Sequence, residues 1–447
     1  MEFLIKATQL ILSLSILVVL HELGHFLPAR WFKIRVEKFY LFFDPWFSLF
    51  KKKVGDTEYG VGWLPLGGYV KISGMVDESM DKEQMAQPAQ PWEFRSKPAW
   101  QRLIVMIGGV TVNLLLGMLI YIMVLFVWGR EYLPISNATY GIHPSKTLVA
   151  AGVQEGDRII SIDGVAPKTT GEAGKAIMID DARTMVVERN GVQVTIALPE
   201  GLNQQALAAG EKEIMAVRLP FYIDSILPGG AAAKTSLSKG DRVLSVNGKQ
   251  TLFFEDFRKT MQEEKGKEVA IAVLRGSDTL TVNAQVDAEG KVGLGPMTYK
   301  KLAERGEGFA TVKEEYGFFA SIPAGINYGL ETLGGYVRSL KLLFTKSGAE
   351  QIGGFGAIGN MFPASWDWNA FWNMTAFLSI ILAFMNILPI PALDGGHVLF
   401  LIYEMIAGKP APQRVMEVAQ MVGMILLFGL ILFANGNDIF KGITGRF

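Results

Sequence analysis

The sequence contains no cysteine among its 447 residues. Disulfide bonds, thiol catalysis and zinc–thiolate sites are therefore excluded, and any metal ion must be held by histidine or carboxylate side chains. Histidine is also scarce, because the chain has only four: His21, His25, His143 and His397. Charged residues make up 19% of the chain and their charges cancel. Nothing in this composition favours a nucleic acid as a partner.

Apolar residues, by contrast, make up 50% of the chain and are concentrated in long runs. Four segments are apolar enough to cross a bilayer as helices: one within the first 30 residues, and 103–128, 370–393 and 418–434. No small-residue cleavage site follows the first segment, so we expect it to be retained as a helix rather than removed as a signal peptide. The sequence therefore predicts a membrane protein with four spanning helices.

The basic residues predict how these helices are oriented. Lysine and arginine are abundant between the first two segments, and Lys409 and Arg414 lie between the last two. An excess of positive charge in short loops marks the cytoplasmic side of a membrane protein. We therefore expect both termini, and the long stretch from about 129 to 369, on the opposite side of the membrane.

That long stretch contains an internal repeat. The segment EGDRIISIDG at 155–164 recurs as KGDRVLSVNG at 239–248, and each copy follows a stretch of small residues. Each copy has the pattern of a short strand that ends in an Asp-Gly or Asn-Gly turn. The pattern resembles bacterial PDZ domains, which bind a peptide as an added strand at a sheet edge. Two small β-rich domains with another purpose are the alternative.

The predicted fold class is a polytopic α-helical membrane protein with four transmembrane helices, a membrane-associated β-hairpin and two tandem β-rich PDZ domains. Its predicted parts are the first helix at 1–30, a cytoplasmic, membrane-dipping β region at 31–100, the second helix at 101–128, PDZ domains at 129–212 and 213–298, a linker at 299–369 and the last two helices at 370–447. In the linker, five apolar residues at helical spacing predict a helix that either lies at the membrane surface or packs against other helices. These are Leu330, Leu333, Val337, Leu340 and Phe344.

The motif that carries the most chemistry is HELGH at 21–25, at the end of the first apolar segment. In a helix, His21 and His25 share one face and can both bind one metal ion, and Glu22 lies beside them. This is the H-E-x-x-H pattern of zinc proteases, in which the glutamate acts on a water molecule. Because an ionisable group at membrane depth is costly, an idle glutamate is not expected there. The alternative is a pair of histidines that only end a helix.

Tetrahedral zinc needs a third ligand from the protein. The candidate is Asp394 in NILPIPALDGGH, which follows the third apolar segment. The predicted topology places Asp394 at the same depth as His21. A carboxylate that only ends a helix at the lipid boundary is the alternative. His397, one helical turn further on, is either a rival ligand or a neighbour of the ligand set.

Several helix-modifying residues lie in the apolar segments near these motifs. Pro389 and Pro391 cannot continue a regular helix, so the backbone is predicted to open between the third segment and the LDG sequence. Asn386 precedes these prolines, and Asn113 lies in the second segment. Each asparagine either bonds a neighbouring helix or holds the substrate. The second segment also has three glycines that permit close helix approach: Gly108, Gly109 and Gly117.

The segment 58–75 is apolar and rich in β-forming residues, but glycines interrupt it. They are Gly60, Gly62, Gly67 and Gly68. The preceding KKKVGDTEYG predicts a hairpin turn. We predict a β-ribbon that dips toward the membrane beside the metal and offers free backbone groups to an extended peptide. An ordinary cytoplasmic hairpin is the alternative.

With these motifs in place, the whole chain resembles the site-2 protease family of intramembrane zinc metalloproteases. The resemblance rests on HELGH, NILPIPALDGG and the repeat between them. It implies a zinc cofactor and four site residues: the ligands His21, His25 and Asp394, and the general base Glu22. It also implies that the glycine-rich ribbon binds the substrate as a strand and that Asn386 lines the site; we assign Asn113 to the same substrate-binding group. The family's usual Gly-Pro-Ile-Gly run is replaced here by GGFGAIGN at 353–360, which leaves the shape of that loop open.

The resemblance further implies partners and a location. Family substrates are single-pass membrane proteins already cut on the outside, such as anti-sigma factors in a stress response, and remnant signal peptides. The PDZ pair, in contact with substrate, would exclude uncut proteins. The expected location is the bacterial inner membrane, with PDZ domains and both termini in the periplasm and the active site near the cytoplasm. Two rivals are a membrane-anchored PDZ scaffold, which the intact motif disfavours, and a metal transporter, which would need more polar residues along a path.

Overall fold

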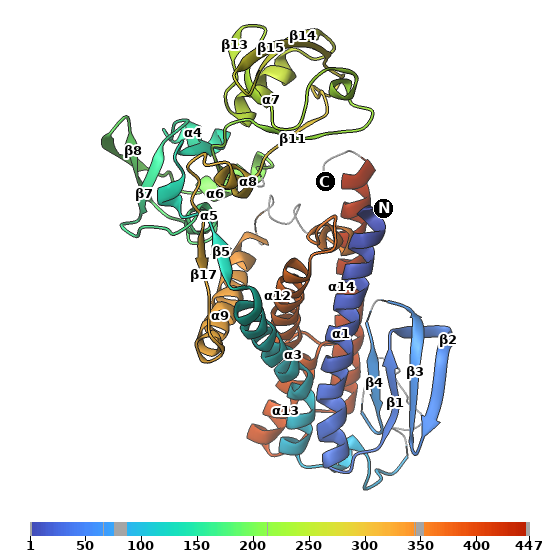
Figure 1. The fold of residues 1–447 in the computed structure, drawn as a ribbon. Coiled ribbons are helices and arrows are strands. Elements are labelled where there is room, and N and C mark those ends of the chain that lie inside the picture. The colour runs from blue at the N-terminus through green and yellow to red at the C-terminus, as the bar shows by residue number, and fades with distance from the viewer. Residues whose placement is uncertain are drawn as a thin grey trace. The chain divides into compact units, whose positions relative to one another are not determined.

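The computed structural model describes residues 2–65, 67–75, 87–211, 213–343, 345 and 353–443. The chain divides into two compact units (Figure 1). One consists of Met1–Gly129 and Glu315–Phe447, and we call it the helical unit. The other is Arg130–Glu314, and we call it the β-rich unit.

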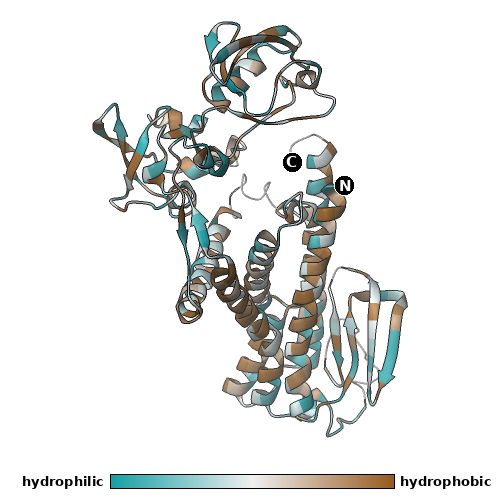
Figure 2. Ribbon diagram, in the orientation of Figure 1, coloured by the Kyte–Doolittle hydropathy of each residue, from teal (hydrophilic) through white to brown (hydrophobic). Residues whose placement is uncertain are grey.

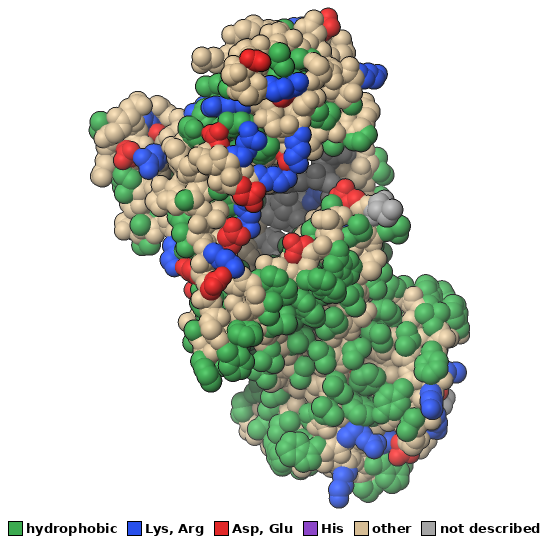
Figure 3. Space-filling view, viewed as in Figure 1, with side chains coloured by type: hydrophobic (Ala, Val, Ile, Leu, Met, Phe, Trp, Pro, Cys, Tyr) green, Lys and Arg blue, Asp and Glu red, His purple; other side chains and the backbone are tan. Residues whose placement is uncertain are grey.

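Among the described residues, four helices are long and apolar enough to cross a membrane, which confirms the four predicted segments. They are α1 (Glu2–Trp31), α3 (Ala99–Trp128), α12 (Trp368–Ile387) and α14 (Gln413–Ile443). Hydrophobic residues run along all four helices in Figure 2, and hydrophobic side chains gather on the surface of the helical unit in Figure 3. Helix α3 is central, because it packs against α1, α12, α9 (Phe318–Leu343) and α13 (Asp394–Ala407).

Glycines let α1 and α3 cross in direct backbone contact. A Cβ atom added at Gly24 would overlap the backbone of Gly108, and one added at Gly108 would overlap the carbonyl of Gly24. At Gly117, a Cβ atom would overlap Ile380 of α12. The close helix approach predicted from the glycines of the second segment is therefore confirmed. Because no side chain separates α1 from α3 at this crossing, backbone atoms alone fix their separation.

The helix predicted in the linker is part of α9, and it packs inside the helical unit. Gly325 lies against Ile122 of α3, and the ring of Tyr336 meets that of Phe384 of α12 edge to face, with centroids 5.9 Å apart. Phe344, the last residue of the predicted apolar stripe, lies outside the described residues. These contacts favour a packing helix over one that lies free at the membrane surface.

The predicted break before the LDG sequence lies between α12 and α13. Helix α12 ends at Ile387, and α13 begins at Asp394. The turn between them folds back tightly, because a Cβ atom at Gly395 would overlap the carbonyl of Ile387. Ala392 has a φ of 77°, and its N–H donates a hydrogen bond to the Gln420 side chain of α14 at 3.1 Å. Helix α14 therefore holds the turn that precedes Asp394.

The GGFGAIGN sequence leads into a short helix, α11 (Phe355–Asn360), which two side chains of α14 hold in place. The buried carboxylate of Asp438 accepts hydrogen bonds from the N–H groups of Gly354 and Ala357, both at 2.9 Å. Asn435, one turn earlier on α14, accepts a third from the N–H of Phe355 at 3.2 Å. Side chains of α14 thus accept hydrogen bonds from the backbone N–H groups of this segment, which lacks the family's proline.

We expect Asp438→Ala to destabilise the protein, because it leaves the N–H groups of Gly354 and Ala357 without their acceptor. The expected cost is about 1–3 kcal/mol, measured as a lower thermal unfolding temperature in detergent. Ile439→Ala is the matched control, since Ile439 is the next residue on α14 and its side chain is 65% exposed. Equal unfolding temperatures for the two variants would show that these hydrogen bonds do not stabilise the fold.

A four-stranded sheet follows α1 in the helical unit. Its strands are β1 (Val36–Leu41), β2 (Phe43–Val54), β3 (Thr57–Leu64) and β4 (Tyr69–Ile72), in the order β2-β3-β1-β4. The β2–β3 hairpin turns at Gly55, whose φ is 62°, which confirms the turn predicted in KKKVGDTEYG. Phe39 of β1 and Tyr59 of β3 pack against Phe26, so one face of the sheet lies on α1. A short 3-10 helix, η1 (Phe94–Ser96), precedes α3.

The prediction of a single β-ribbon over 58–75 is wrong in its strand pairing. Strand β4 pairs antiparallel with β1, and β1 pairs parallel with β3, so β1 lies between the two halves of the segment. Gly60 and Gly62 are in β3, where the Tyr40 ring and the Phe43 backbone occupy the space of a side chain. The chain crosses from β3 to β4 through Gly67 and Gly68.

The β-rich unit contains two copies of one arrangement of strands. In the first copy, β6 (Ile142–Pro144) pairs with β10 (Met215–Val217), beside a sheet of β7 (Arg158–Ile162), β8 (Thr184–Arg189) and β9 (Val192–Ala197). In the second, β11 (Ile223–Ile226) pairs with β16 (Leu294–Pro296), beside β12 (Arg242–Val246), β13 (Lys249–Gln250), β14 (Glu268–Arg275) and β15 (Asp278–Gln285). Each copy encloses its own hydrophobic core.

Short helices and one further strand pair complete the β-rich unit. The helices are α4 (Lys146–Ala150), α5 (Thr170–Met178), α6 (Leu202–Ala208), α7 (Phe254–Glu263) and α8 (Tyr299–Glu304), with 3-10 turns η2 (Ile135–Asn137) and η3 (Ala231–Lys234). Strands β5 (Arg130–Tyr132) and β17 (Val312–Glu314) pair with each other. This pairing brings the two ends of the unit together.

The repeated Gly-Asp-Arg motif makes the same contacts in both copies. The buried side chains of Asp157 and Asp241 each accept two hydrogen bonds from an arginine, Arg189 or Arg275, at 2.7 to 2.8 Å. The predicted boundary between residues 212 and 213 needs correction, because β10 lies beyond it and pairs with β6 of the first copy. The strand pairing places the boundary after Val217.

Candidate metal centre

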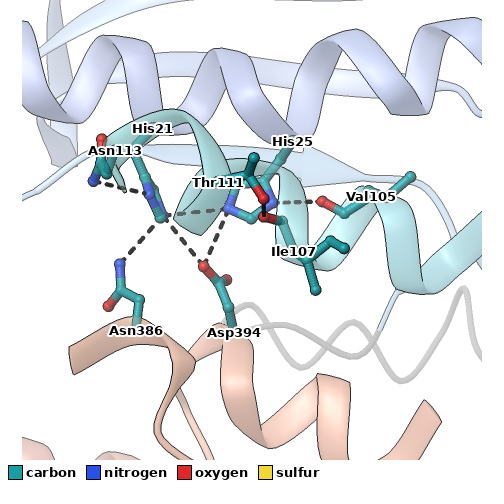
Figure 4. Close-up of polar contacts among 8 residues, drawn as sticks. All are labelled: His21, His25, Val105, Ile107, Thr111, Asn113, Asn386 and Asp394. Carbon is teal, nitrogen blue, oxygen red and sulfur yellow. Dashed lines mark hydrogen bonds and ion pairs between the residues drawn. The ribbon is translucent and has the colours of Figure 1, made fainter. Parts of the chain in front are cut away.

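Three side chains that are far apart in the sequence converge in the helical unit. His21 and His25 come from α1, and Asp394 is the first residue of α13. The His21 and His25 Nε2 atoms are 3.3 Å apart, and the Asp394 Oδ2 atom lies 3.4 Å from the first and 3.3 Å from the second. Figure 4 shows the three side chains pointing toward one another. The structure therefore brings together the three predicted ligands.

The shape of this triangle fits a tetrahedral zinc ion. Zinc binds histidine nitrogen and carboxylate oxygen at about 2.0–2.2 Å, so ligand atoms around it lie roughly 3.3–3.5 Å apart. The observed separations fall in this range. The buried Asp394 Oδ2 atom accepts no hydrogen bond within the part of the chain that the structure describes. A buried carboxylate oxygen that accepts no hydrogen bond and faces two imidazole nitrogens suits a metal ligand.

Helix α3 orients His25. The Nδ1 atom of His25 lies 2.8 Å from the carbonyl oxygen of Val105, so Nδ1 carries the proton and donates it (Figure 4). This tautomer leaves the Nε2 lone pair free to bind a metal. Gly109, also on α3, provides the space, since a Cβ atom there would overlap the rings of both histidines. The close approach predicted at Gly109 is thus also confirmed.

Asn113 on α3 lies beside the other histidine. Its amide nitrogen is 3.3 Å from His21 Nδ1, while its own Oδ1 atom is buried without a partner. Rotating the amide by 180° places Oδ1 on the Nδ1–H group of His21 and satisfies both atoms. The backbone carbonyl of Asn113 also accepts a hydrogen bond from the Ser379 hydroxyl of α12 at 2.7 Å. These contacts favour the helix-bonding alternative for Asn113 over direct substrate binding.

Glu22 lies between the histidines and strand β4. A Cβ atom at Gly68 would contact the Glu22 side chain, and the Glu22 carboxylate accepts a hydrogen bond from the N–H of Val70. That N–H points away from β1, because β4 pairs with β1 along its other edge. The predicted general base therefore faces both the metal ligands and the open edge of β4.

Asn386, near the end of α12, also reaches this site. Its amide nitrogen lies 3.4 Å from His21 Nε2, on the ligand side of that ring (Figure 4). His397 is not part of the triangle; it lines a separate cavity of about 80 Å³ together with Arg102 and Glu404. Among the described residues, His21, His25 and Asp394 are the one group that brings three such ligand atoms together.

Comparison with known proteins agrees with this geometry. Residues 9–430 match the family described as Peptidase family M50. The chain belongs to peptidase family M50, the site-2 proteases. A "Putative zinc metalloprotease" of Xylella fastidiosa (strain Temecula1) is 31% identical over 462 residues, covering 98% of this chain and 99% of the relative. Such names, together with the ligand triangle, show that this M50 protein is a zinc metalloprotease.

Other relatives carry a narrower name. The "Regulator of sigma E protease" of Haemophilus influenzae is 28% identical over 464 residues, covering 99% of this chain and all of the relative. The "Protease RseP" of Yersinia pestis is 28% identical over 469 residues, covering 98% of this chain and 99% of the relative. The M50 protease thus aligns with these proteins from end to end, as the family resemblance of its motifs predicts.

Sequence reasoning did not identify two features of this M50 site. The contact between His25 and the Val105 carbonyl has no sequence signal, because any residue supplies a carbonyl. The Asn113–His21 contact had one signal, a buried amide in an apolar helix, but the sequence does not show which residue it meets. Both contacts depend on how α1 crosses α3.

Proposed function

We propose that this M50 protease cleaves the transmembrane segment of single-pass membrane proteins. The observation that carries the proposal is the location of the ligand triangle on α1 and α13, in the unit whose surface is hydrophobic (Figure 3). A substrate that reaches this site comes through the membrane-facing part of the protein. Relatives named as regulators of sigma E support an anti-sigma-factor-like substrate, already cut on the outside. Remnant signal peptides have the same chemistry and are a second substrate.

The chemistry follows from the positions of the chain's own groups. His21, His25 and Asp394 would hold the zinc ion, which when bound would supply a Lewis acid for the scissile carbonyl and for water. Glu22 takes a proton from the attacking water and delivers it to the amide nitrogen as the C–N bond breaks. Asn386 donates a hydrogen bond to the carbonyl oxygen as negative charge develops on it.

Strand β4 presents the substrate to these groups. A transmembrane helix hides its amides in its own hydrogen bonds, so the substrate has to unwind locally before cleavage. Strand β4 lies at the edge of the sheet and pairs only with β1, so its other edge offers backbone partners to the unwound segment beside Glu22. Gly67 and Gly68 let the chain enter β4 close to α1, because Gly67 has a φ of 150° and a Cβ atom at Gly68 would overlap Val18. Gly60 and Gly62 act indirectly, by letting β3 pack on the residues that support β4.

The β-rich unit acts on substrate choice. We infer that its two copies are PDZ domains, which contact substrates and hold back those with a bulky external domain. The matching element order of the two copies and their shared Asp–Arg contacts support this inference. The excess of lysine and arginine between α1 and α3 supports an orientation with this unit and both termini in the periplasm of a bacterial inner membrane.

The test uses the purified protein in detergent with a model single-pass substrate that lacks an external domain. We expect cleavage within the apolar segment, loss of cleavage when a chelator removes zinc, and recovery when zinc is restored. A parallel reaction contains a soluble, unfolded protein. Cleavage of the soluble protein but not of the membrane substrate, by enzyme with one zinc per chain, would contradict the intramembrane proposal.

A further inference from the structure

The start of β4 is held by an unusual set of contacts. The ring of Tyr69 stacks between those of Tyr40 and Phe43, with centroids 5.3 Å and 6.0 Å away and ring planes within 14° of parallel. Its hydroxyl donates a hydrogen bond to Asp44 Oδ1 at 2.9 Å. The other oxygen of Asp44 accepts a hydrogen bond from Ser48 at 3.0 Å. Tyr69 is therefore fixed at both its ring and its hydroxyl.

Asp44 lies in an irregular part of the sheet, because the pairing of β2 with β3 shifts register between Phe43 and Ser48. On either side of Asp44, Phe42 and Trp46 have φ values of 67° and 75°. Bulky residues adopt this left-handed conformation only when surrounding contacts compensate its cost. The bulge therefore directs the Asp44 carboxylate toward β4.

The depth of this carboxylate also requires an explanation. Gly68, next to Tyr69, lies against Val18 and Glu22 of α1, so Tyr69 and Asp44 lie near the level of the metal ligands. An ionisable side chain at membrane depth is costly and is associated with function. Burial and the bond to Asp44 raise the pKa of the Tyr69 phenol, so its hydroxyl keeps the proton that it donates.

Tyr69 restrains β4 close to the reaction site. It follows the pair Gly67 and Gly68, which limit the backbone little, and it precedes Val70, whose N–H bonds to Glu22. Release of the Tyr69 hydroxyl leaves the start of β4 held by its pairs with β1 and by the stacked ring, and so less tightly fixed relative to Glu22. A substrate strand paired with β4 would shift with it.

We propose that Asp44, acting through Tyr69, is a positioning residue that determines which substrate peptide bond lies at the metal centre. This inference rests on the proposed function, because it takes β4 as the strand that carries the substrate. It adds a residue that sets the position of the cut, separate from those that perform the chemistry. Glu58, which accepts a hydrogen bond from Tyr40 at 2.7 Å, supports the same stack from β3.

The first experiment measures where the active enzyme cuts. Tyr69→Phe removes one hydroxyl and keeps the stacked ring, Asp44→Ala removes its acceptor, and Asp44→Asn keeps an acceptor oxygen. Tyr59→Phe is the matched control, because the Tyr59 hydroxyl makes no hydrogen bond within the described part of the chain. Products of a single-pass substrate are identified by mass spectrometry, with kcat and KM measured for each variant and zinc content checked.

We expect Tyr69→Phe and Asp44→Ala to cut at two or more neighbouring bonds, with kcat reduced by about 10-fold or more because the scissile bond is misplaced. Zinc content stays unchanged, the double variant is no worse than either single variant, and Asp44→Asn recovers the single cut. If Tyr69→Phe cuts only the wild-type bond with the kcat and KM of Tyr59→Phe, the proposal is wrong.

The second experiment reads the register without cleavage and so separates this proposal from the proposed function. Because the chain has no cysteine, Lys71→Cys on β4 introduces a single thiol, placed in a Glu22→Gln background. Substrates with one cysteine at successive positions are tested for disulfide cross-linking. We expect cross-linking at one dominant substrate position in the parent. When Tyr69→Phe is added, we expect cross-linking at the neighbouring positions as well. Equal cross-linking at every position in the parent, or none, would overturn the proposal whether or not the enzyme cuts.

Discussion

Glu22→Gln is expected to abolish peptide cleavage while leaving zinc bound. The amide keeps the shape of the side chain but cannot take a proton from water, and loss of a general base typically lowers the rate by about 10²–10⁴-fold. Zinc should remain because Glu22 is not one of the three converging ligands. The measurements are the cleavage rate of a single-pass substrate and the zinc content per chain by mass spectrometry.

Glu2→Gln is the matched control for this variant, because it makes the same change at the other end of α1, where the Glu2 side chain is 63% exposed. We expect it to cleave at the wild-type rate. Wild-type cleavage by Glu22→Gln would exclude Glu22 as the general base. Loss of zinc from Glu22→Gln would instead show that the carboxylate takes part in holding the metal.

Asp394→Ala is expected to remove both zinc and activity. Two imidazoles from one helix remain, and a catalytic zinc site is built from three protein ligands. Loss of even a supporting contact around a metal costs about 10–100-fold in affinity, so loss of a ligand should cost more. The zinc content per chain after dialysis against a weak chelator measures this effect, and we expect it to fall from one to near zero.

Asp56→Asn, in the exposed turn between β2 and β3, is the matched control and should keep its zinc. The contrast between Glu22→Gln, which keeps zinc, and Asp394→Ala, which loses it, separates catalysis from metal binding. If Asp394→Ala retains one zinc per chain with wild-type affinity, another residue completes the site and the triangle does not describe it.

The convergence of His21, His25 and Asp394 could be predicted from the sequence because two independent patterns point to it. The spacing of His21 and His25 places both on one helix face, and membrane topology alone brings Asp394 to their depth. The structure brings all three within 3.4 Å of one another. Local periodicity and a count of membrane crossings were sufficient for this part of the site.

The β region could be predicted only in part. Turn chemistry at Gly55 identifies the β2–β3 hairpin, because the two strands are adjacent in sequence. The parallel pairing of β1 with β3 has no such local signal, and it depends on packing against α1. The prediction of one ribbon over 58–75 failed for this reason. The contact between Asp44 of β2 and Tyr69 of β4 could not be predicted from the sequence for the same reason.

The backbone contact between α1 and α3 has a consequence for how the protease tolerates lipids of different length. A bilayer that becomes thinner forces its helices to tilt. Helices separated by long side chains can tilt independently, because the side chains change rotamer, but two backbones in contact at Gly24 and Gly108 have no such freedom. We expect α1 and α3 to tilt as one body, carrying both histidines.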